Sequence, residues 1–144
     1  MKKVFVLVLI LLTFLSFNAF GQEQLADKLI VYYFHGDFRC QTCMTIEQQT
    51  KEAILQNFKE AVDNGKIEIK VVNYDKKENK HFKKDYGLFT KSVVLSLVQS
   101  GQETSFNNLQ NVWQLVRNKD QFGEYIKSET QKYLDRLVKE GKQQ

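Results

Sequence analysis

The chain of 144 residues contains no proline, and it has only two cysteines and two histidines. Without proline, no part of the fold can use a cis prolyl bond. Two cysteines cannot close a four-ligand zinc site, and no second cysteine pair or H-x₃-H spacing completes one. The chain also lacks a glycine-rich phosphate loop and any spacing of residues typical of a hydrolase. These absences exclude several common enzyme and metal-site classes.

Residues 1–21 are typical of a secretory signal peptide. A basic start, MKK, precedes the almost wholly apolar residues 4–17, and the stretch ends in an A-x-A-like pattern, AFG. We expect cleavage after Gly21, which leaves one exported domain, residues 22–144, in the periplasm or outside the cell. The alternative is an uncleaved N-terminal membrane anchor, because the apolar stretch approaches the roughly 17–25 residues of a spanning helix. There is no cysteine near the expected cleavage site, so we do not expect a lipid-anchored lipoprotein.

The charge of the expected mature domain is nearly balanced. The whole chain has 21 basic and 17 acidic residues. Residues 1–21 contain two of the basic residues, Lys2 and Lys3, and no acidic ones, so the mature domain would have 19 basic and 17 acidic residues. Lysines recur between residues 76 and 86, but Glu78 and Asp85 interrupt them, so we interpret this stretch as a solvated face. The sequence therefore predicts no nucleic-acid partner.

Apolar patterning predicts alternating strands and helices. The expected strands are residues 29–34, 67–73, 92–98 and 103–106, and the expected helices are 41–63, 76–86, a single turn at 112–116 and a last helix from Asp120. The helix between the first two strands requires them to run parallel through a right-handed crossover. The short turn after residue 98 makes the last two strands antiparallel.

Some local expectations follow from the same patterns. In the first helix, Met44 falls among the core positions, while Glu47 and Lys51 form an ion pair on the outer face. Asp75 is expected to cap the short helix that follows the second strand. We expect residues 107–108, both asparagine, to leave the sheet.

The most informative stretch is LIVYYFHGDFRCQTC, residues 29–43. It predicts a buried strand, a short turn, and two cysteines at the start of a helix. Free backbone N–H groups and the positive end of the helix dipole stabilise a thiolate there. Cys40 should be the more exposed of the two, and Cys43 should lie behind it at disulfide distance. Because so short a loop removes little unfolded-state entropy, the pair suits redox exchange better than stapling.

This order of elements, with C-x-x-C after the first strand, resembles the thioredoxin family. The run DYGL at residues 85–88, followed by a loop and an apolar strand, is similar to the thioredoxin segment that leads into the active-site proline loop. The resemblance implies a thioredoxin-like α/β fold, a three-layer α/β/α arrangement with a four-stranded mixed sheet. The run YYFHGDFRCQTC also resembles small exported proteins known as the ArsF-family subunit of a nitrophenyl-compound nitroreductase.

The thioredoxin resemblance also implies roles for the cysteines. Cys40 would be the attacking thiolate and Cys43 the resolving thiol of a thiol–disulfide oxidoreductase. The positive charge of Arg39 should lower the pKa of Cys40. The resemblance implies no cofactor. Its partners would be protein disulfides or dithiols, together with a membrane-bound or soluble electron donor if the protein acts as a reductant.

The chain departs from the thioredoxin pattern at several places near the cysteines. Arg39 stands where a tryptophan usually precedes the first cysteine, and Gln41-Thr42 replaces the usual Gly-Pro between the two cysteines. The position of the active-site cis-proline falls on Ser92, preceded by Lys91, and a cis bond before a non-proline residue costs about 2.5–4 kcal/mol. We therefore expect this bond to be trans. The acid that the family often buries behind its cysteines has no clear counterpart, since Phe34 stands near that place. His35 and Asp37 are candidate substitutes.

Two other functions remain open at this point. Cys40, Cys43, Met44 and His35 are clustered in sequence, and thiolates suit Cu(I), Zn(II) or trivalent arsenic. The same cysteines could therefore bind a soft metal or metalloid, although no complete metal site is predicted. The domain could also be a non-catalytic subunit of a complex, with a purely structural disulfide.

Overall fold

The computed structural model describes residues 26–140, so the expected signal peptide and its cleavage site lie outside the described residues. The elements, in order, are β1 (Lys28–His35), α2 (Gln41–Asp63), β2 (Ile67–Asn73), the 3₁₀ turn η1 (Lys77–Asn79), α3 (His81–Asp85), β3 (Ser92–Gln99), β4 (Gln102–Asn108), α4 (Val112–Leu115) and α5 (Lys119–Glu140). Across this part of the chain, no helix is both long enough and apolar enough to cross a bilayer.

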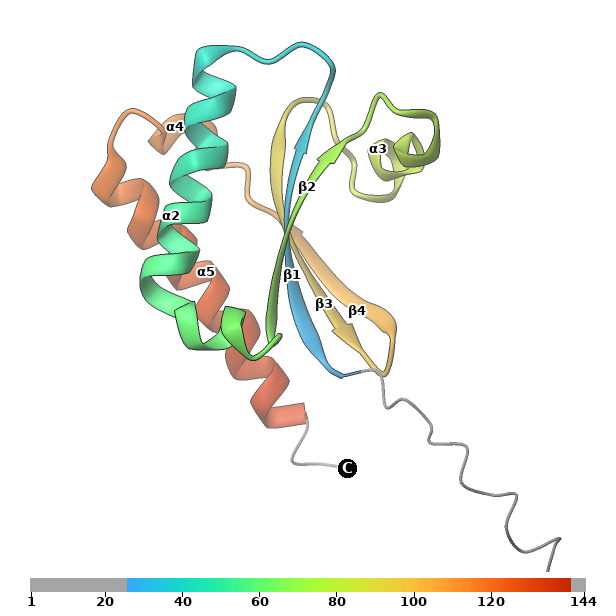
Figure 1. The fold of residues 1–144 in the computed structure, drawn as a ribbon, viewed down its shortest axis with the longest axis vertical. Coiled ribbons are helices and arrows are strands. Elements are labelled where there is room, and N and C mark those ends of the chain that lie inside the picture. The colour runs from blue at the N-terminus through green and yellow to red at the C-terminus, as the bar shows by residue number, and fades with distance from the viewer. Residues whose placement is uncertain (1–25, 141–144) are drawn as a thin grey trace, which may run out of the picture.

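The strands form one mixed sheet in the order β2-β1-β3-β4. β1 and β2 run parallel, whereas β3 is antiparallel to both β1 and β4. Helices α2 and α5 lie side by side on one face, and α3 lies on the other (Figure 1). The predicted α/β/α arrangement, three layers around a four-stranded mixed sheet, is therefore confirmed.

Alternation along β1 divides the core into two clusters. Leu29, Val31 and Tyr33 point toward α2 and α5 and join a large cluster of mostly aliphatic side chains. Their neighbours in sequence point toward α3 and join a smaller cluster rich in aromatic rings. Successive side chains of a strand point to opposite faces, so one wholly apolar strand serves both layers. This is why the run YYF is continuously buried.

Helix α2 has a clear beginning and end. Cys40 occupies the N-cap position with extended backbone angles, φ −87° and ψ 163°. After the C-cap at Asn64, Gly65 adopts a φ of +77°, a conformation that glycine accepts without steric cost. Inside the helix, Phe58 departs from helical geometry, with φ −134° and ψ 28°, and marks a kink. The predicted bounds of this helix are confirmed, but the kink left no signal in the sequence.

Two expectations about α2 are wrong. Met44 is 42 % exposed, because Cys43 and Ile46 take the inward positions and Met44 lies about 100° around the helix from Cys43. Glu47 does pair with Lys51, at 2.6 Å, but its side chain is only 13 % exposed and is not on the outer face. The surroundings of Glu47 therefore belong to the site described below.

Two expectations about the remaining elements are also wrong. The single helix expected at 76–86 is divided into η1 and α3, and η1 begins without a side-chain cap. Asp75 instead accepts hydrogen bonds from the backbone N–H of Asp37 and from the Lys83 ammonium. Residues 107–108 stay in β4, paired with β3. The backbone groups of buried β3 need partners, and this requirement outweighs the low strand propensity of asparagine.

Candidate functional site

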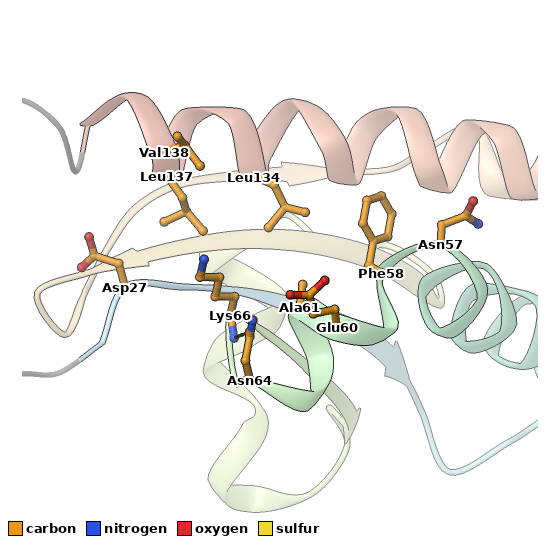
Figure 2. A pocket seen from close by; sticks show the side chains of 10 residues that line it. All are labelled: Asp27, Asn57, Phe58, Glu60, Ala61, Asn64, Lys66, Leu134, Leu137 and Val138. Carbon is orange, nitrogen blue, oxygen red and sulfur yellow. Dashed lines mark hydrogen bonds between the residues drawn. The ribbon is translucent and has the colours of Figure 1, made fainter.

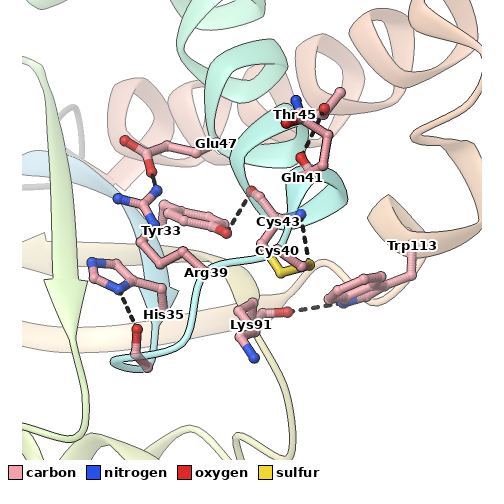
Figure 3. Close-up of a disulfide and its surroundings, with 11 residues drawn as sticks. Tyr33, His35, Arg39, Cys40, Gln41, Cys43, Thr45, Glu47, Lys91 and Trp113 are labelled. Carbon is pink, nitrogen blue, oxygen red and sulfur yellow. Dashed lines mark hydrogen bonds and ion pairs between the residues drawn. A yellow bond between two sulfur atoms is a disulfide. The ribbon is translucent and has the colours of Figure 1, made fainter.

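Cys40 and Cys43 form a disulfide at the first turn of α2, with their Cα atoms 5.0 Å apart (Figure 3). Cys40 is partly exposed, whereas Cys43 is 1 % exposed and lies in the protein interior. The backbone N–H of Cys43 donates a hydrogen bond to the Cys40 sulfur over 3.1 Å. An N–H donor at a helix N-terminus stabilises negative charge on that sulfur. The structure therefore places the two sulfurs as a reactive pair requires.

Tyr33 ties the cysteines to the sheet. Its hydroxyl donates a 2.6 Å hydrogen bond to the carbonyl oxygen of Cys43, in a buried position. Burial is the main cause that raises the pKa of Tyr33 to about 12, although the nearby Arg39 charge acts to lower it. Tyr33 thus remains a neutral donor at physiological pH. Sequence analysis placed this residue in the strand but missed its contact with Cys43.

Arg39, the residue before Cys40, is engaged in an ion pair. Its guanidinium binds the carboxylate of Glu47 (Figure 3). The other oxygen of this carboxylate accepts a hydrogen bond from the Lys51 ammonium over 2.6 Å. Burial acts to raise the pKa of Glu47, but the hydrogen bonds from Lys51 and Arg39 outweigh it and the net pKa is lowered. Glu47 is therefore an ionised, largely buried carboxylate near the cysteines, which sequence analysis did not assign to the site.

Lys91 and Ser92 lie where β3 starts, beside the end of β1. Ser92 is opposite Phe34 in the sheet, is buried, and donates its hydroxyl hydrogen to the Thr90 carbonyl over 2.9 Å. The Lys91 carbonyl accepts a 2.9 Å hydrogen bond from the indole N–H of Trp113 (Figure 3). Residues 26–140 contain no cis peptide bond, so the Lys91–Ser92 bond is trans, as expected.

The substitutes considered for a buried acid have other partners. Nδ1 of His35 lies 2.8 Å from the Gly36 carbonyl, and the Asp37 carboxylate accepts a 2.7 Å bond from the Asn73 amide. Phe34 is fully buried in the cluster that faces α3. In the described part of the chain, no three His, Cys, Asp or Glu side chains gather where they could hold a metal ion.

The loop that precedes Cys40 is fastened to the end of β2. The backbone N–H of Asp37 donates to the Asp75 carboxylate over 2.9 Å. The chain passes so close that a Cβ atom on Gly36 would stand 2.5 Å from an oxygen of Asp75. A side chain at this position would therefore displace the Asp75 carboxylate, which binds the loop through the Asp37 N–H.

Two phenylalanines are exposed in the loops that lead to Cys40 and to Lys91. Phe38 is 74 % exposed, and Phe89, in the loop before Lys91, is fully exposed. The Lys91 ammonium lies 5.7 Å from the centre of the Phe38 ring. Exposed apolar side chains that gather on one surface mark binding sites for other molecules.

Two hollows meet at Trp113 beside these side chains. One, of about 270 Å³, is lined by Phe89, Lys91 and Ser92 among others. The other, of about 560 Å³, is lined by Gln41 and Thr42, the residues between the cysteines. The surface around the disulfide is thus concave on one side and flanked by exposed rings.

A separate hollow of about 580 Å³ lies between the last turns of α2 and α5. Phe58 of α2 and Leu134 and Leu137 of α5 point into it (Figure 2). Its first lining residue on α2, Asn57, is roughly 24 Å along the helix from Gln41, at 1.5 Å per residue. This hollow is therefore not part of the cysteine site.

Comparisons with known proteins find matches among solved structures alone. No family model matches the chain, and no curated protein matches it. Among solved structures, thioredoxin from Fasciola hepatica is 18 % identical, with 66 % of this chain and 81 % of that chain covered and a TM-score of 0.37. Chlamydomonas reinhardtii thioredoxin f2 is 19 % identical, with coverages of 69 % and 85 % and a TM-score of 0.38. A malarial protein is 16 % identical, with coverages of 56 % and 80 % and a TM-score of 0.37. We base the fold assignment on the sheet topology itself.

Proposed function

We propose that this protein is a thiol–disulfide oxidoreductase that exchanges disulfides with partner proteins through Cys40 and Cys43. The observation that carries the proposal is the disulfide at the N-terminus of α2, with one sulfur reachable and the other buried behind it. Its closed loop is too short to stabilise the fold much by restricting the unfolded chain. A labile pair is the better explanation of its position.

In the reducing direction, the thiolate of Cys40 attacks one sulfur of a partner disulfide. The partner's S–S bond breaks, its second sulfur leaves as a thiolate, and a mixed disulfide joins Cys40 to the partner. Cys43 then loses its proton and attacks the Cys40 sulfur, which releases the partner as a dithiol and closes the Cys40–Cys43 disulfide. Two electrons pass to the partner, and the reverse sequence oxidises a partner dithiol.

The surroundings favour this chemistry at Cys40. The Cys43 N–H group already points at the Cys40 sulfur, so the thiolate form gains a hydrogen bond without rearrangement. Tyr33 holds the Cys43 carbonyl and so keeps the first turn of α2 in place. Cys43 can act only on a sulfur brought to Cys40, because it is buried.

The exposed rings favour a protein as the partner. Phe38 lies two residues before Cys40 and Phe89 two residues before Lys91, and both offer exposed apolar area. Aromatic side chains are enriched where proteins bind each other. A small thiol such as glutathione needs no such surface. The partner would meet this face in an exported compartment, after removal of residues 1–21, and a soluble or membrane-bound donor would return the electrons. The similarity of the cysteine-bearing run to the ArsF-family proteins supports an exported location.

Trapping of partners tests the proposal directly. Cys43→Ser removes the resolving thiol, so mixed disulfides on Cys40 should accumulate in cells and disappear on reduction before electrophoresis. Cys40→Ser, the matched control, should trap none, because Cys43 is buried. In the reduced wild-type protein, iodoacetamide should modify Cys40 well below pH 8 and Cys43 far more slowly. Equal and slow modification of both cysteines, with no trapped partner, would show that the disulfide is only structural.

A further inference from the structure

Three charged side chains at and after the start of α2 bind one another, and we call them the Glu47 cluster: Arg39, Glu47 and Lys51. Arg39 stands directly before Cys40 in the chain, yet its guanidinium is bound to Glu47. Lys51 binds the other carboxylate oxygen, and the Glu47 side chain is only 13 % exposed. The ion pair is thus partly shielded from solvent, where charges interact more strongly than on the surface.

The disulfide carries no charge, whereas the reduced pair carries a thiolate at Cys40. Nearby charges therefore change the free energy of the reduced form far more than that of the oxidised form. An opposite charge within about 4–6 Å lowers a thiol pKa, and a like charge raises it. A carboxylate that engages Arg39 weakens the positive field at Cys40 in two ways: it adds a negative charge, and it draws the guanidinium toward itself.

We propose that Glu47 sets the reduction potential of the cysteine pair by holding Arg39 away from the Cys40 sulfur. This inference rests on the proposed function, and Glu47 is a positioning residue that acts through Arg39. Lys51 competes with Arg39 for the same carboxylate and so limits its hold. The cluster keeps the thiolate of Cys40 less stable than Arg39 alone would make it, which favours the disulfide and makes the protein more reducing.

Other polar and charged groups also lie around the disulfide. They are the Tyr33 hydroxyl on β1, His35 at its end, Lys91 before β3 and Arg117 after α4, which lines the hollow with Gln41 and Thr42. The hydrogen bonds of the Glu47 carboxylate go to Arg39 and Lys51 and not to these groups, so we expect them to stay in place when Glu47 is changed. A matched substitution elsewhere on α2 therefore isolates the effect of this carboxylate.

Glu47→Gln and Glu52→Gln form a matched pair. Both substitutions remove one negative charge from α2 and keep the shape of the side chain. Glu52, however, lies five residues after Glu47 on α2 and is paired with Lys119 of α5. In Glu47→Gln we expect the pKa of Cys40, read from the pH profile of iodoacetamide modification, to fall by about one unit. The equilibrium with glutathione should shift toward the dithiol by up to about tenfold, which is about 30 mV for a two-electron couple. Glu52→Gln should leave both values unchanged, and Lys51→Gln should shift them the opposite way.

A double-mutant cycle separates positioning from a direct charge effect. In an Arg39→Gln background, Glu47→Gln should shift the pKa of Cys40 much less than it does in the wild type. Equal shifts in both backgrounds, or equal shifts for Glu47→Gln and Glu52→Gln, would overturn the inference while leaving the exchange function intact. If Glu47→Gln melts early, Lys51→Gln takes its place in the cycle: its opposite shift in the pKa of Cys40 should shrink in the Arg39→Gln background, and an equal shift in both backgrounds would overturn the inference. Failure of the wild-type protein itself to exchange with glutathione would instead overturn the proposed function.

Discussion

The two faces of the sheet are packed with different kinds of side chain. The face under α2 and α5 is covered by two long helices and packed mainly with aliphatic side chains. The face under α3 is covered by a helix of five residues, and aromatic rings fill the space: Tyr32, Phe34, Phe82, Tyr86 and Phe106 contact one another there. Each aromatic ring buries a large area, so a few rings replace a second long helix.

Side chains connect the cysteine site to the face under α2 and α5, which we call the first face. Tyr33 points toward α2 and binds the Cys43 carbonyl, and Cys43 itself is buried against that layer. The second face reaches the site through two loops: the loop before Cys40, which Asp75 holds, and residues 87–91, which lead from α3 to Ser92. This difference predicts that damage to the aromatic face lowers stability without altering the redox chemistry, whereas changes on the first face affect both.

The largest effect is expected in the aliphatic layer. Ile54 is fully buried between α2 and the sheet, and its neighbour Leu55 is exposed on the same helix. Ile54→Ala should lower the free energy of unfolding by about 2–5 kcal/mol, because it removes buried methyl groups and leaves a cavity. Leu55→Ala, a change of the same size, should cost less than about 1 kcal/mol. Urea denaturation of the oxidised protein measures both, and similar losses would mean that α2 does not pack as described.

A smaller effect is expected from the aromatic face. The Tyr86 hydroxyl donates to the Glu103 carboxylate at 2.5 Å, and the Ser96 hydroxyl binds the same oxygen. Tyr86→Phe removes one donor to a charged group, so it should cost about 1.5–3 kcal/mol. Its equilibrium with glutathione should equal that of the wild type. A shifted equilibrium would show that the two faces are coupled at the cysteines.

Local pattern was enough to predict the fold and the cysteine pair. The apolar run that forms β1, the glycine that ends α2 and the spacing of Cys40 and Cys43 each act over a few residues, so the sequence displays them directly. The same patterns could not reveal what fills each face. A helix at 76–86 was predicted, but its division into η1 and α3 depends on how aromatic rings pack beneath it.

The charged part of the site escaped prediction for a related reason. Glu47 and Lys51 stand four residues apart, which is the spacing of an ordinary exposed pair on a helix. Arg39 reaches Glu47 from a loop outside the helix, and only the fold brings the two together. Asp75 likewise had the pattern of a helix cap, but its carboxylate binds a loop 38 residues earlier in the chain. Contacts between distant segments leave no periodic signal.

The smallest effect, and the most specific to the first face, concerns Tyr33. Tyr33→Phe loses a neutral hydrogen bond to the Cys43 carbonyl, so it should cost about 0.5–1.5 kcal/mol at pH 7. In the unfolded chain a tyrosine ionises near pH 10, but the folded-state pKa of Tyr33 is raised to about 12. Between these values the unfolded state binds fewer protons, so stability falls as pH rises.

Tyr33→Phe should remove the part of this pH-dependent loss of stability that comes from Tyr33, because phenylalanine has no proton to lose. The stability difference between wild type and variant, measured by urea denaturation, should therefore narrow from pH 9 to pH 11. The stability difference between wild type and Tyr86→Phe should narrow in the same way. The pKa of Tyr86 is also raised, chiefly by burial and then by its hydrogen bond to Glu103. Only the variant of Tyr33 should also change the rate of Cys40 modification, because only its hydroxyl holds the turn that carries the cysteines. An unchanged rate of Cys40 modification in Tyr33→Phe would mean that the N-terminus of α2 positions the Cys40 sulfur without the hydrogen bond from Tyr33 to the Cys43 carbonyl.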